Sequence, residues 1–538
     1  MKNIRTTWIP ASLLTLPIII YFSAYWFNHT DDLIPTGFIQ YDNPAYVAYA
    51  KQYLEADKFQ LFYSNPFNDS GNYSAIYFQP QTLLIAFLMK VGISPSIVLI
   101  LLTVMCSLLC FVLIIKIYDT LYPGGKYRLL SIIFFAWGGG IFFLSDIPLQ
   151  FIYPSIQHLF GNKPLILDPG SGWWGMNLGR SLFFSCEAYY HLLFLCSILL
   201  ILEKRWILSL FTMLILSLSH PFTGIELLSI IAAWVCIERF IAGNRTIPFY
   251  LITGTLFLLA LHVFYYLYYL NQFPDHASTS QQYSLNWRIR FYNMIPAYFI
   301  VGFFSILTIR ICKWNVILKE RNSRLFLTWF FVAFILANHE VFMKPMQPIH
   351  FTRGYIWSSL FLFGLRGLHH FFSTIEKMSW RRPALAVFFI IFLLDNGTWV
   401  FNNARAKAGT KSISYITSEE KNVLDTLAAT TDNRSLIIGY SDEQEAMIPY
   451  LATVYTKAWS WTSHPFTTPY IDRKRKAFAV FIANGTIDSA WRNRHCVFVF
   501  RKTNDSELKR AGTLHFPFTV LLDSKLYTVV SAKISATD

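Results

Sequence analysis

Long apolar segments separated by short polar links extend from the N-terminus to about residue 403. The first, Ile9–Phe27, contains no charged residue and follows Lys2 and Arg5. Further apolar segments are Ser96–Tyr118, Leu129–Asp146, Leu182–Leu202, Trp206–Ser219, Gly224–Ile241, Ile247–Leu270, Tyr292–Ile311, Leu325–Asn338, Gly354–Phe372 and Pro383–Val400. Because about 20 apolar residues cross a bilayer as a helix, this pattern predicts an all-α polytopic bundle over residues 1–403 with about eleven transmembrane helices.

A polar segment at residues 28–78 interrupts this pattern early, and its Asp and Glu residues outnumber its Lys residues. It leads into the short apolar run Ile76–Val91, which is broken by the residues from Gly92 to Pro95. A run of this length is too short for a span. We therefore expect an outer loop over residues 28–78, followed by an interfacial helix over residues 76–92.

The hydropathy falls from about residue 404, and helix and strand patterns then alternate. Thr417 and Glu420 have the spacing of a capping box, which predicts the start of a helix. A second, basic helix is predicted at Ile471–Asn484. Strands are predicted at Ser435–Tyr440, Cys496–Phe500, Thr519–Leu522 and Tyr527–Ser531. This alternation predicts a soluble α/β domain over residues 404–538.

Composition and charge agree with a membrane protein. Hydrophobic residues make up 54% of the chain and charged residues 14%, whereas soluble domains carry about 25% charge. The net charge of +14 does not indicate nucleic-acid binding, because the cations concentrate in short links. These links are Lys116–Arg128, Lys204–Arg205, Arg239–Arg245, Arg310–Arg324 and Lys377–Arg382. With a cytoplasmic N-terminus every one of them faces the cytoplasm, as the positive-inside rule requires. The C-terminal domain then lies outside, and we expect a multi-pass protein of a bacterial inner membrane with a periplasmic domain.

The outer loop holds the most informative candidate chemistry. Asp42 lies directly before a helical pattern that begins near Tyr46. One interpretation is that Asp42 or Asn43 caps this helix. The other is that Asp42, a carboxylate at a helix N-terminus by the membrane surface, accepts a proton from an attacking hydroxyl or amine.

A single span, an acidic outer loop with Asp42 four residues before Tyr46, and an interfacial helix before the second span recur in superfamily C glycosyltransferases, which the chain resembles. In their protein O-mannosyltransferases and lipid A aminoarabinose transferases the loop carries an Asp-Glu pair, and here Asn43 takes the place of the Glu. The resemblance implies that Asp42 is the catalytic base; the pair Asp31–Asp32 is an alternative. The tail resembles outer domains of bacterial members, in which an aromatic loop with a histidine, here His464, precedes a helix.

The resemblance implies a glycosyltransferase that moves a sugar from a polyprenyl-phosphate donor to a lipid, glycan or protein acceptor at the outer face. The reaction would be inverting, with Asp42 as base. No cofactor is implied with certainty, although a divalent metal ion at Asp42 stays open. The triplet from Gly138 to Gly140 lies in an apolar segment without the Lys and Ser or Thr of a phosphate loop, so we interpret it as helix packing or a kink.

Further candidates for substrate binding lie at the predicted outer ends of the spans. The glycine and aromatic segment around Trp173, with Arg180, could stack on a sugar ring, or Trp173 could be an interfacial anchor. His220 could bond a phosphate oxygen or cap a broken helix. Glu187 and His191, four residues apart on one helical face, could extend the site or take part in a structural pair across neighbouring spans.

The densest polar cluster follows the segment Leu325–Asn338. It contains Glu340, Lys344, His350 and Arg353. The planar guanidinium of Arg353 matches phosphate oxygens, so Arg353 is the first candidate for holding the lipid phosphate. The alternative is an interfacial arginine that binds ordinary phospholipid headgroups.

Two other functions stay open. A lipid or saccharide transporter, such as a flippase, also has many spans, but such proteins often show internal repeats and broken helices. A non-catalytic assembly protein could use its outer domain to hold a partner, and this would leave the acidic loop unexplained.

Overall fold

The computed structural model of the 538-residue chain forms two compact units. One comprises Met1–Ala24, Leu102–Tyr266 and Ser284–Ala406, and the other Tyr25–Leu101, Leu267–Tyr283 and Lys407–Asp538. The structure describes residues 2–27, 30, 32–55, 60–68, 74–156, 158, 176–282, 284–285, 289, 291–404, 413–441, 447–462, 464 and 467–535. We call them the helical unit and the mixed unit.

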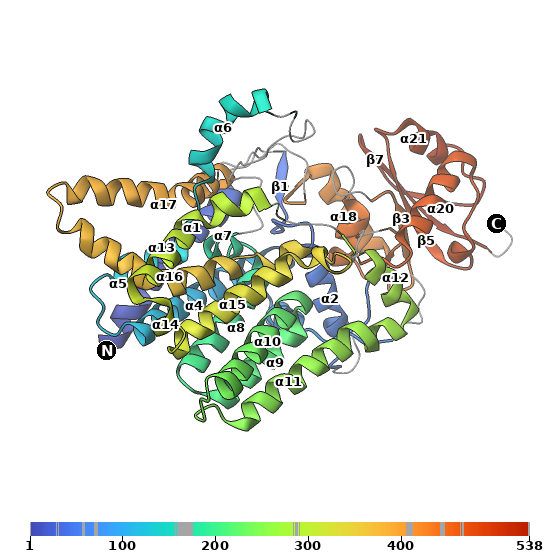
Figure 1. Ribbon diagram of the computed structural model, residues 1–538. Helices are drawn as coiled ribbons and strands as arrows, with labels where there is room; N and C mark the ends of the chain where they lie inside the picture. Colours follow the sequence, from blue (N-terminus) through green and yellow to red (C-terminus); the bar gives the residue numbers. More distant parts are fainter. Residues whose placement is uncertain are drawn as a thin grey trace. The chain divides into compact units, whose positions relative to one another are not determined.

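Helices account for the regular structure of the helical unit (Figure 1). They are α1 (Lys2–Phe27, to Ala24), α4 (Pro95–Leu121, from Leu102), α5 (Arg128–Trp137), α6 (Phe142–Ile156), α7 (Leu178–Ser181), α8 (Ser185–Leu202), α9 (Trp206–Ser219), α10 (Pro221–Cys236), α11 (Phe249–Val263), α13 (Phe291–Cys312), α14 (Trp314–Ile317), α15 (Arg321–Ala337), α16 (Tyr355–Ile375) and α17 (Arg381–Ala404). Short π and 3-10 segments are η2 (Ile237–Ile241), η3 (Phe264–Tyr269, to Tyr266), η5 (His339–Val341) and η6 (Pro348–Phe351).

Six helical segments in the described part of the chain are long and apolar enough to cross a membrane. They are Arg5–Phe27, Pro95–Leu121, Ser185–Leu202, Phe249–Gln272, Asn293–Cys312 and Arg381–Phe401. The chain is therefore an integral membrane protein. Each predicted apolar segment contains helix, but several of these helices are shorter than a full span. The predicted number of eleven spans is not confirmed.

The segment Leu129–Asp146, predicted as one span with helix packing or a kink at its glycine triplet, instead contains two helices with a break between them. The break falls at the glycine triplet, and a Cβ atom on Gly140 would lie 2.2 Å from the carbonyl oxygen of Pro296. Asp395 stabilises the new helix start, since its carboxylate accepts hydrogen bonds from the N–H groups of Phe142 (2.9 Å) and Phe143 (3.0 Å). The triplet thus ends one helix and lets the chain approach α13 closely.

Close helix packing holds the helical unit together. Helix α13 packs along α16, and a Cβ atom on Gly367 of α16 would lie 2.3 Å from the carbonyl oxygen of Phe304. Small residues at such contacts let two backbones approach, which is the usual way in which membrane helices gain packing energy. Helices α8, α9, α10, α11 and α15 pack against one another in a second group (Figure 1).

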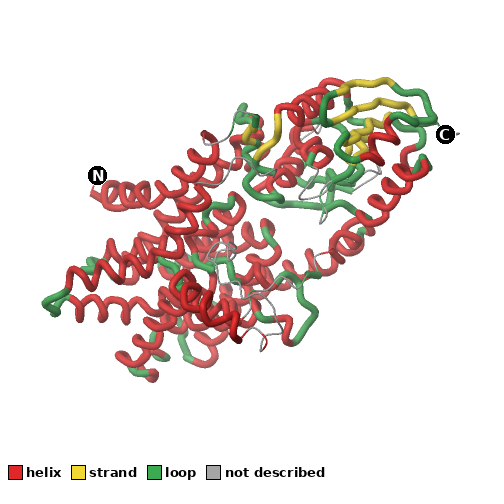
Figure 2. Tube along the Cα trace, turned by 90° about the horizontal axis from the view of Figure 1, so that it is seen from above, coloured by secondary structure: helices red, strands yellow, loops and turns green. Residues whose placement is uncertain are grey.

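The mixed unit contains all described strands (Figure 2). Strand β1 (Leu33–Pro35) pairs antiparallel with β2 (Tyr415–Thr417). A five-stranded sheet has the order β4-β3-β5-β7-β6, with β4 (Trp459–Ser460), β3 (Leu436–Gly439), β5 (His495–Arg501), β7 (Tyr527–Lys533) and β6 (Thr519–Asp523). The four predicted strands correspond to β3, β5, β6 and β7.

The remaining elements of the mixed unit are mainly helices. They are α2 (Asn43–Glu55), α3 (Pro80–Lys90), η4 (Leu270–Gln272), α12 (Pro274–Gln282), α18 (Ser418–Thr430), α19 (Ile448–Tyr455), α20 (Ile471–Asn484), η7 (Ser489–Trp491) and α21 (Asp505–Ala511). The capping box at Thr417 and Glu420 is confirmed, and α20 has the predicted bounds. The buried side chains of Phe478, Phe498 and Trp491 join α20, β5 and η7 in one apolar core.

Candidate functional site

Asp42 and His464 come together in the mixed unit. Nε2 of His464 lies 2.8 Å from Oδ1 of Asp42, and 422 positions of sequence separate the two residues. The side chain of His464 is 2% exposed, whereas that of Asp42 is 46% exposed. A buried imidazole thus holds one oxygen of a carboxylate that stays open to solvent.

The local sequence explains why Asp42 stands at the start of α2. The side-chain oxygen of Asn43 accepts hydrogen bonds from the backbone N–H groups of Ile39 (3.1 Å) and Gln40 (3.0 Å), which closes the loop before the helix. Asp42 therefore lies at the positive end of the α2 dipole, where a negative charge is favoured.

Aromatic side chains surround His464. The rings of Tyr41 (4.9 Å), Tyr450 (5.2 Å) and Phe67 (6.4 Å) lie around the imidazole, as measured between ring centroids. Tyr450 of α19 also joins the loop to the C-terminal region, because its hydroxyl donates to the carbonyl oxygen of Tyr41 (2.7 Å) and accepts from the N–H of Ala45 (3.0 Å). The position of the histidine is fixed by packing on several sides.

Burial and charge set the protonation of two neighbours of this site. Burial, and the negative charge of Asp42, raise the pKa of Tyr450 well above its ordinary value, so its hydroxyl remains a donor. Burial lowers the pKa of Lys51 on α2, although its ion pair with Glu55 (3.5 Å) acts in the opposite direction. Lys51 also donates to the carbonyl oxygens of Thr453 and Thr456.

A second polar cluster lies inside the helical unit. Arg353 is 4% exposed and forms an ion pair with Glu187 of α8. Its guanidinium also lies 3.3 Å from Nε2 of His350, which in turn lies 2.6 Å from the side-chain oxygen of Gln347. Glu187 of α8 therefore forms a structural pair with Arg353, which lies just before α16.

Stacked rings continue this cluster. His350 stacks on Phe222 (4.3 Å) and His220 on Tyr190 (4.4 Å), measured between centroids. His220 is the N-cap residue of α10, because its Nδ1 accepts from the N–H of Thr223 (3.2 Å). His220 therefore caps α10, which is one of the two interpretations of its sequence position.

The other predicted binding residues are dispersed. Lys344 is exposed and Glu340 half-buried, both in the polar segment before α16, and Tyr46 lies half-buried on α2. Arg180 belongs to the helix break: its guanidinium donates to Asn396 (2.9 Å) and to the carbonyl oxygen of Asp395 (2.9 Å). Trp173 and Asp31 lie outside the described residues.

Sequence reasoning missed Tyr450 and the partner of Arg353. Tyr450 lies in the eight-residue helix α19, which is too short for a clear periodic pattern. Glu187 gave a signal, since a charged residue in an apolar segment demands a partner. Among the described residues, no three His, Cys, Asp or Glu side chains gather as metal ligands would.

Comparison with known proteins gives little further information. No protein-family model and no curated protein matches the sequence. The structure is similar to that of ArnT from Cupriavidus metallidurans in the apo state, with a TM-score of 0.49, 10% sequence identity, and coverage of 97% of this chain and 98% of that chain.

Proposed function

We propose that the protein is an inverting glycosyltransferase that uses a polyprenyl-phosphate-linked sugar, with Asp42 as its general base. The observation that carries the proposal is the half-exposed carboxylate of Asp42, held by a buried histidine at a helix start. The resemblance of the outer loop to superfamily C glycosyltransferases supports the same role. We place the loop at the outer membrane face, because the positive-inside rule predicts that the basic links are cytoplasmic.

The reaction balances with one base and no covalent intermediate. The acceptor hydroxyl or amine attacks the anomeric carbon of the donor, and its proton passes to the carboxylate of Asp42. The bond between this carbon and the phosphate oxygen breaks, and the electron pair leaves with the phosphate. The products are the glycosylated acceptor, with inverted configuration, and the polyprenyl phosphate.

His464 acts as a positioning residue in this mechanism. Its ring nitrogen contacts one oxygen of Asp42, so the carboxylate is held in one orientation. A base held in one orientation loses less entropy when the acceptor arrives, and such pre-organisation is a large part of enzymatic rate enhancement. Tyr41 and Tyr450 keep the imidazole in place by packing.

We assign the donor phosphate to the polar segment before α16. Lys344 is exposed there and offers a first contact for an anion. Arg353 and His350 lie at the end of the same segment, and a phosphate would replace Glu187 as the partner of Arg353. Neutralising the phosphate charge makes it a better leaving group, which is why a cation is needed beside it.

The variant Asp42→Asn tests the proposal. Purified protein in nanodiscs is incubated with a panel of polyprenyl-phosphate sugars and membrane-extract acceptors, and release of polyprenyl phosphate is followed by mass spectrometry. We expect the variant to lose a factor of about 10²–10⁴ in rate, because this is what a general base contributes. Donor binding and thermal stability should not change.

Asp32→Asn provides the matched control, since Asp32 is an exposed carboxylate in the same loop. It should retain full activity. Full activity of Asp42→Asn, or equal loss in both variants, would contradict the assignment of the base. Lipid that moves between leaflets without release of polyprenyl phosphate would instead identify a flippase.

A further inference from the structure

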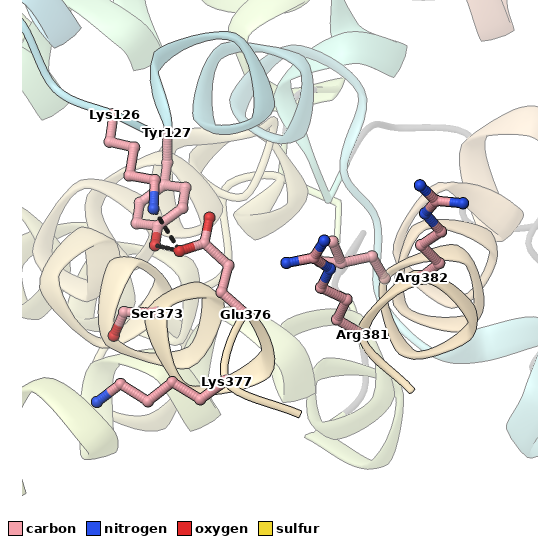
Figure 3. Close-up of a pocket in the computed structure, with 8 residues that line it drawn as sticks. Lys126, Tyr127, Ser373, Glu376, Lys377, Arg381 and Arg382 are labelled. Atoms are coloured by element: carbon pink, nitrogen blue, oxygen red, sulfur yellow. Dashed lines mark hydrogen bonds and ion pairs between the residues drawn. The ribbon is translucent and has the colours of Figure 1, made fainter. Parts of the chain in front are cut away.

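A basic cavity of about 740 Å³ lies in the helical unit, where α16 ends and α5 and α17 begin (Figure 3). Four cations line it: Lys126, Lys377, Arg381 and Arg382. They belong to links that the positive-inside pattern predicts to be cytoplasmic. The positive-inside rule thus predicts a cytoplasmic cavity, and the proposed function does not use it.

One carboxylate balances only part of this charge. Glu376 accepts hydrogen bonds from Nζ of Lys126 and from the hydroxyl of Tyr127 (2.9 Å), as the dashed lines in Figure 3 mark. The side chains of Lys377, Arg381 and Arg382 form no hydrogen bond or ion pair with any residue that the structure describes. Three of the four cations thus form no ion pair, although the charge of Arg381 also acts on Glu376.

The start of α17 adds to the attraction for an anion. Helix α17 has 24 residues and begins at Arg381, with no acidic residue in its first turn. The N-terminal end of a helix of this length carries a partial positive charge and N–H groups without helical partners. Figure 3 shows the side chain of Arg381 extending toward Glu376, with Arg382 on the same helix extending away from it.

Apolar groups beside the cations indicate an amphiphilic ligand. Leu385, one turn into α17, lines the cavity. Trp380, directly before the helix, is 57% exposed, and tryptophan in such a place commonly lies at the headgroup level of a bilayer. The candidate span Arg381–Phe401 starts at the cavity, so a lipid headgroup can enter while its acyl chains remain among the helices.

We propose that this cavity binds the phosphate headgroup of an anionic phospholipid of the adjacent leaflet. Basic pockets at the ends of transmembrane helices bind such headgroups, and each nearby Lys or Arg adds to the affinity. The three unpaired cations and the volume suit a headgroup with two phosphates, such as that of cardiolipin. A free phosphate shares the charge but does not use Trp380 and Leu385.

Native mass spectrometry of the full-length protein with added cardiolipin tests this assignment. The variant Lys377→Gln, Arg381→Gln, Arg382→Gln removes the three unpaired cations. Three cations, each contributing roughly a fivefold factor, should together change the apparent affinity by on the order of one hundredfold. Zwitterionic phosphatidylcholine and inorganic phosphate should bind the unchanged protein much more weakly than cardiolipin does.

The matched control is Lys204→Gln, Arg245→Gln, Lys319→Gln, which removes three exposed cations from other links of the same predicted face. It should bind cardiolipin as the unchanged protein does. A charge-keeping variant, Lys377→Arg, Arg381→Lys, Arg382→Lys, should bind cardiolipin as the unchanged protein does. Its binding would show that the first variant loses affinity through its missing charges and not through misfolding. Equal losses in cavity and control variants, or equal binding of inorganic phosphate and cardiolipin, would overturn the proposal.

Discussion

The two polar clusters of this protein differ in how their charges are satisfied. In the mixed unit, the imidazole of His464 is buried and the carboxylate of Asp42 is 46% exposed. In the helical unit, both members of the pair Arg353 and Glu187 are buried. The cluster in the mixed unit presents a carboxylate to solvent, whereas in the cluster of the helical unit the two charges form a buried ion pair.

This difference indicates that the exposed carboxylate serves the reaction and that the buried ion pair serves the stability of the fold. A carboxylate that is about half exposed can take a proton from an incoming acceptor without first being uncovered. A buried ion pair must first break, and each ion taken from water already carries a large desolvation penalty. We therefore expect changes at Asp42 to affect activity, and changes at Arg353 to affect folding first and donor binding second.

The largest expected effect on stability follows from removing one member of the buried pair. Arg353→Ala or Glu187→Ala should lower the free energy of unfolding by about 3–5 kcal/mol, because the remaining charge is buried without a partner. Thermal unfolding in detergent measures this loss. The variant Asp42→Asn, whose side chain is half-exposed, should unfold at the temperature of the unchanged protein.

A double variant sharpens this comparison. Glu187→Met combined with Arg353→Met replaces the pair by apolar side chains and should recover most of the lost stability. If Arg353 holds the donor phosphate, the recovered protein should still fail to bind donor. A stable double variant with unchanged donor affinity would remove Arg353 from the proposed site.

A pH effect is expected in the mixed unit. Nδ1 of His276 on α12 lies 3.0 Å from the hydroxyl of Tyr77, and burial lowers the pKa of His276 from 6.5 to about 4. The lower pKa in the folded state means that the unfolded chain binds a proton at His276 more readily than the folded protein does. The free energy of unfolding therefore has its full value above pH 6.5 and decreases by up to about 3 kcal/mol as the pH falls toward 4. Unfolding temperatures measured across this window should fall less steeply for His276→Gln. Identical pH profiles would show that His276 is not responsible.

A smaller effect is expected at the positioning histidine. His464→Phe keeps a ring of similar size but loses the nitrogen that holds Asp42, so we expect transfer to slow by roughly tenfold and stability to fall by about 1–2 kcal/mol. His464→Gln keeps a side-chain N–H and should recover part of the rate. The pH profile of the rate distinguishes positioning from packing, because only the loss of the contact to the carboxylate shifts the profile of the base. An unshifted profile in His464→Phe would make the histidine purely structural.

The membrane helices could be predicted from sequence because lipid solvates their side chains. A long apolar run then determines a helix whatever its neighbours are, and α9 (Trp206–Ser219) has its predicted bounds. At Gly138 to Gly140 the sequence predicts helix packing or a kink but not a full break, because the residues that cause the break lie elsewhere in the chain. Asp395 and Pro296, which fix the break, are far from the triplet in sequence.

The candidate site was only partly predictable, because its contacts also join residues that lie far apart in the sequence. Asp42 stands out locally, as an acidic residue before a helical pattern in a polar loop. Its contact with His464 joins residues 422 positions apart, and no local pattern contains that information. Tyr450 was missed because a tyrosine in a short apolar helix looks like any core residue, although its hydroxyl connects the backbone of Tyr41 with that of Ala45 on α2.

The smallest expected effect concerns that hydroxyl. Tyr450→Phe keeps the ring beside His464 but removes the hydrogen bonds to the backbone of Tyr41 and Ala45, which should lower the free energy of unfolding by about 1 kcal/mol. The raised pKa of Tyr450 means that its contribution is complete below its ordinary value of about 10 and is lost only as the pH rises through the folded-state value. The difference between variant and unchanged protein, measured by thermal unfolding, should therefore stay constant at neutral and mildly alkaline pH. Transfer should fall by only a few-fold, because His464 still holds Asp42. A loss as large as that of Asp42→Asn would mean that the hydroxyl of Tyr450 itself takes part in the reaction, and would move the base from one residue to a pair.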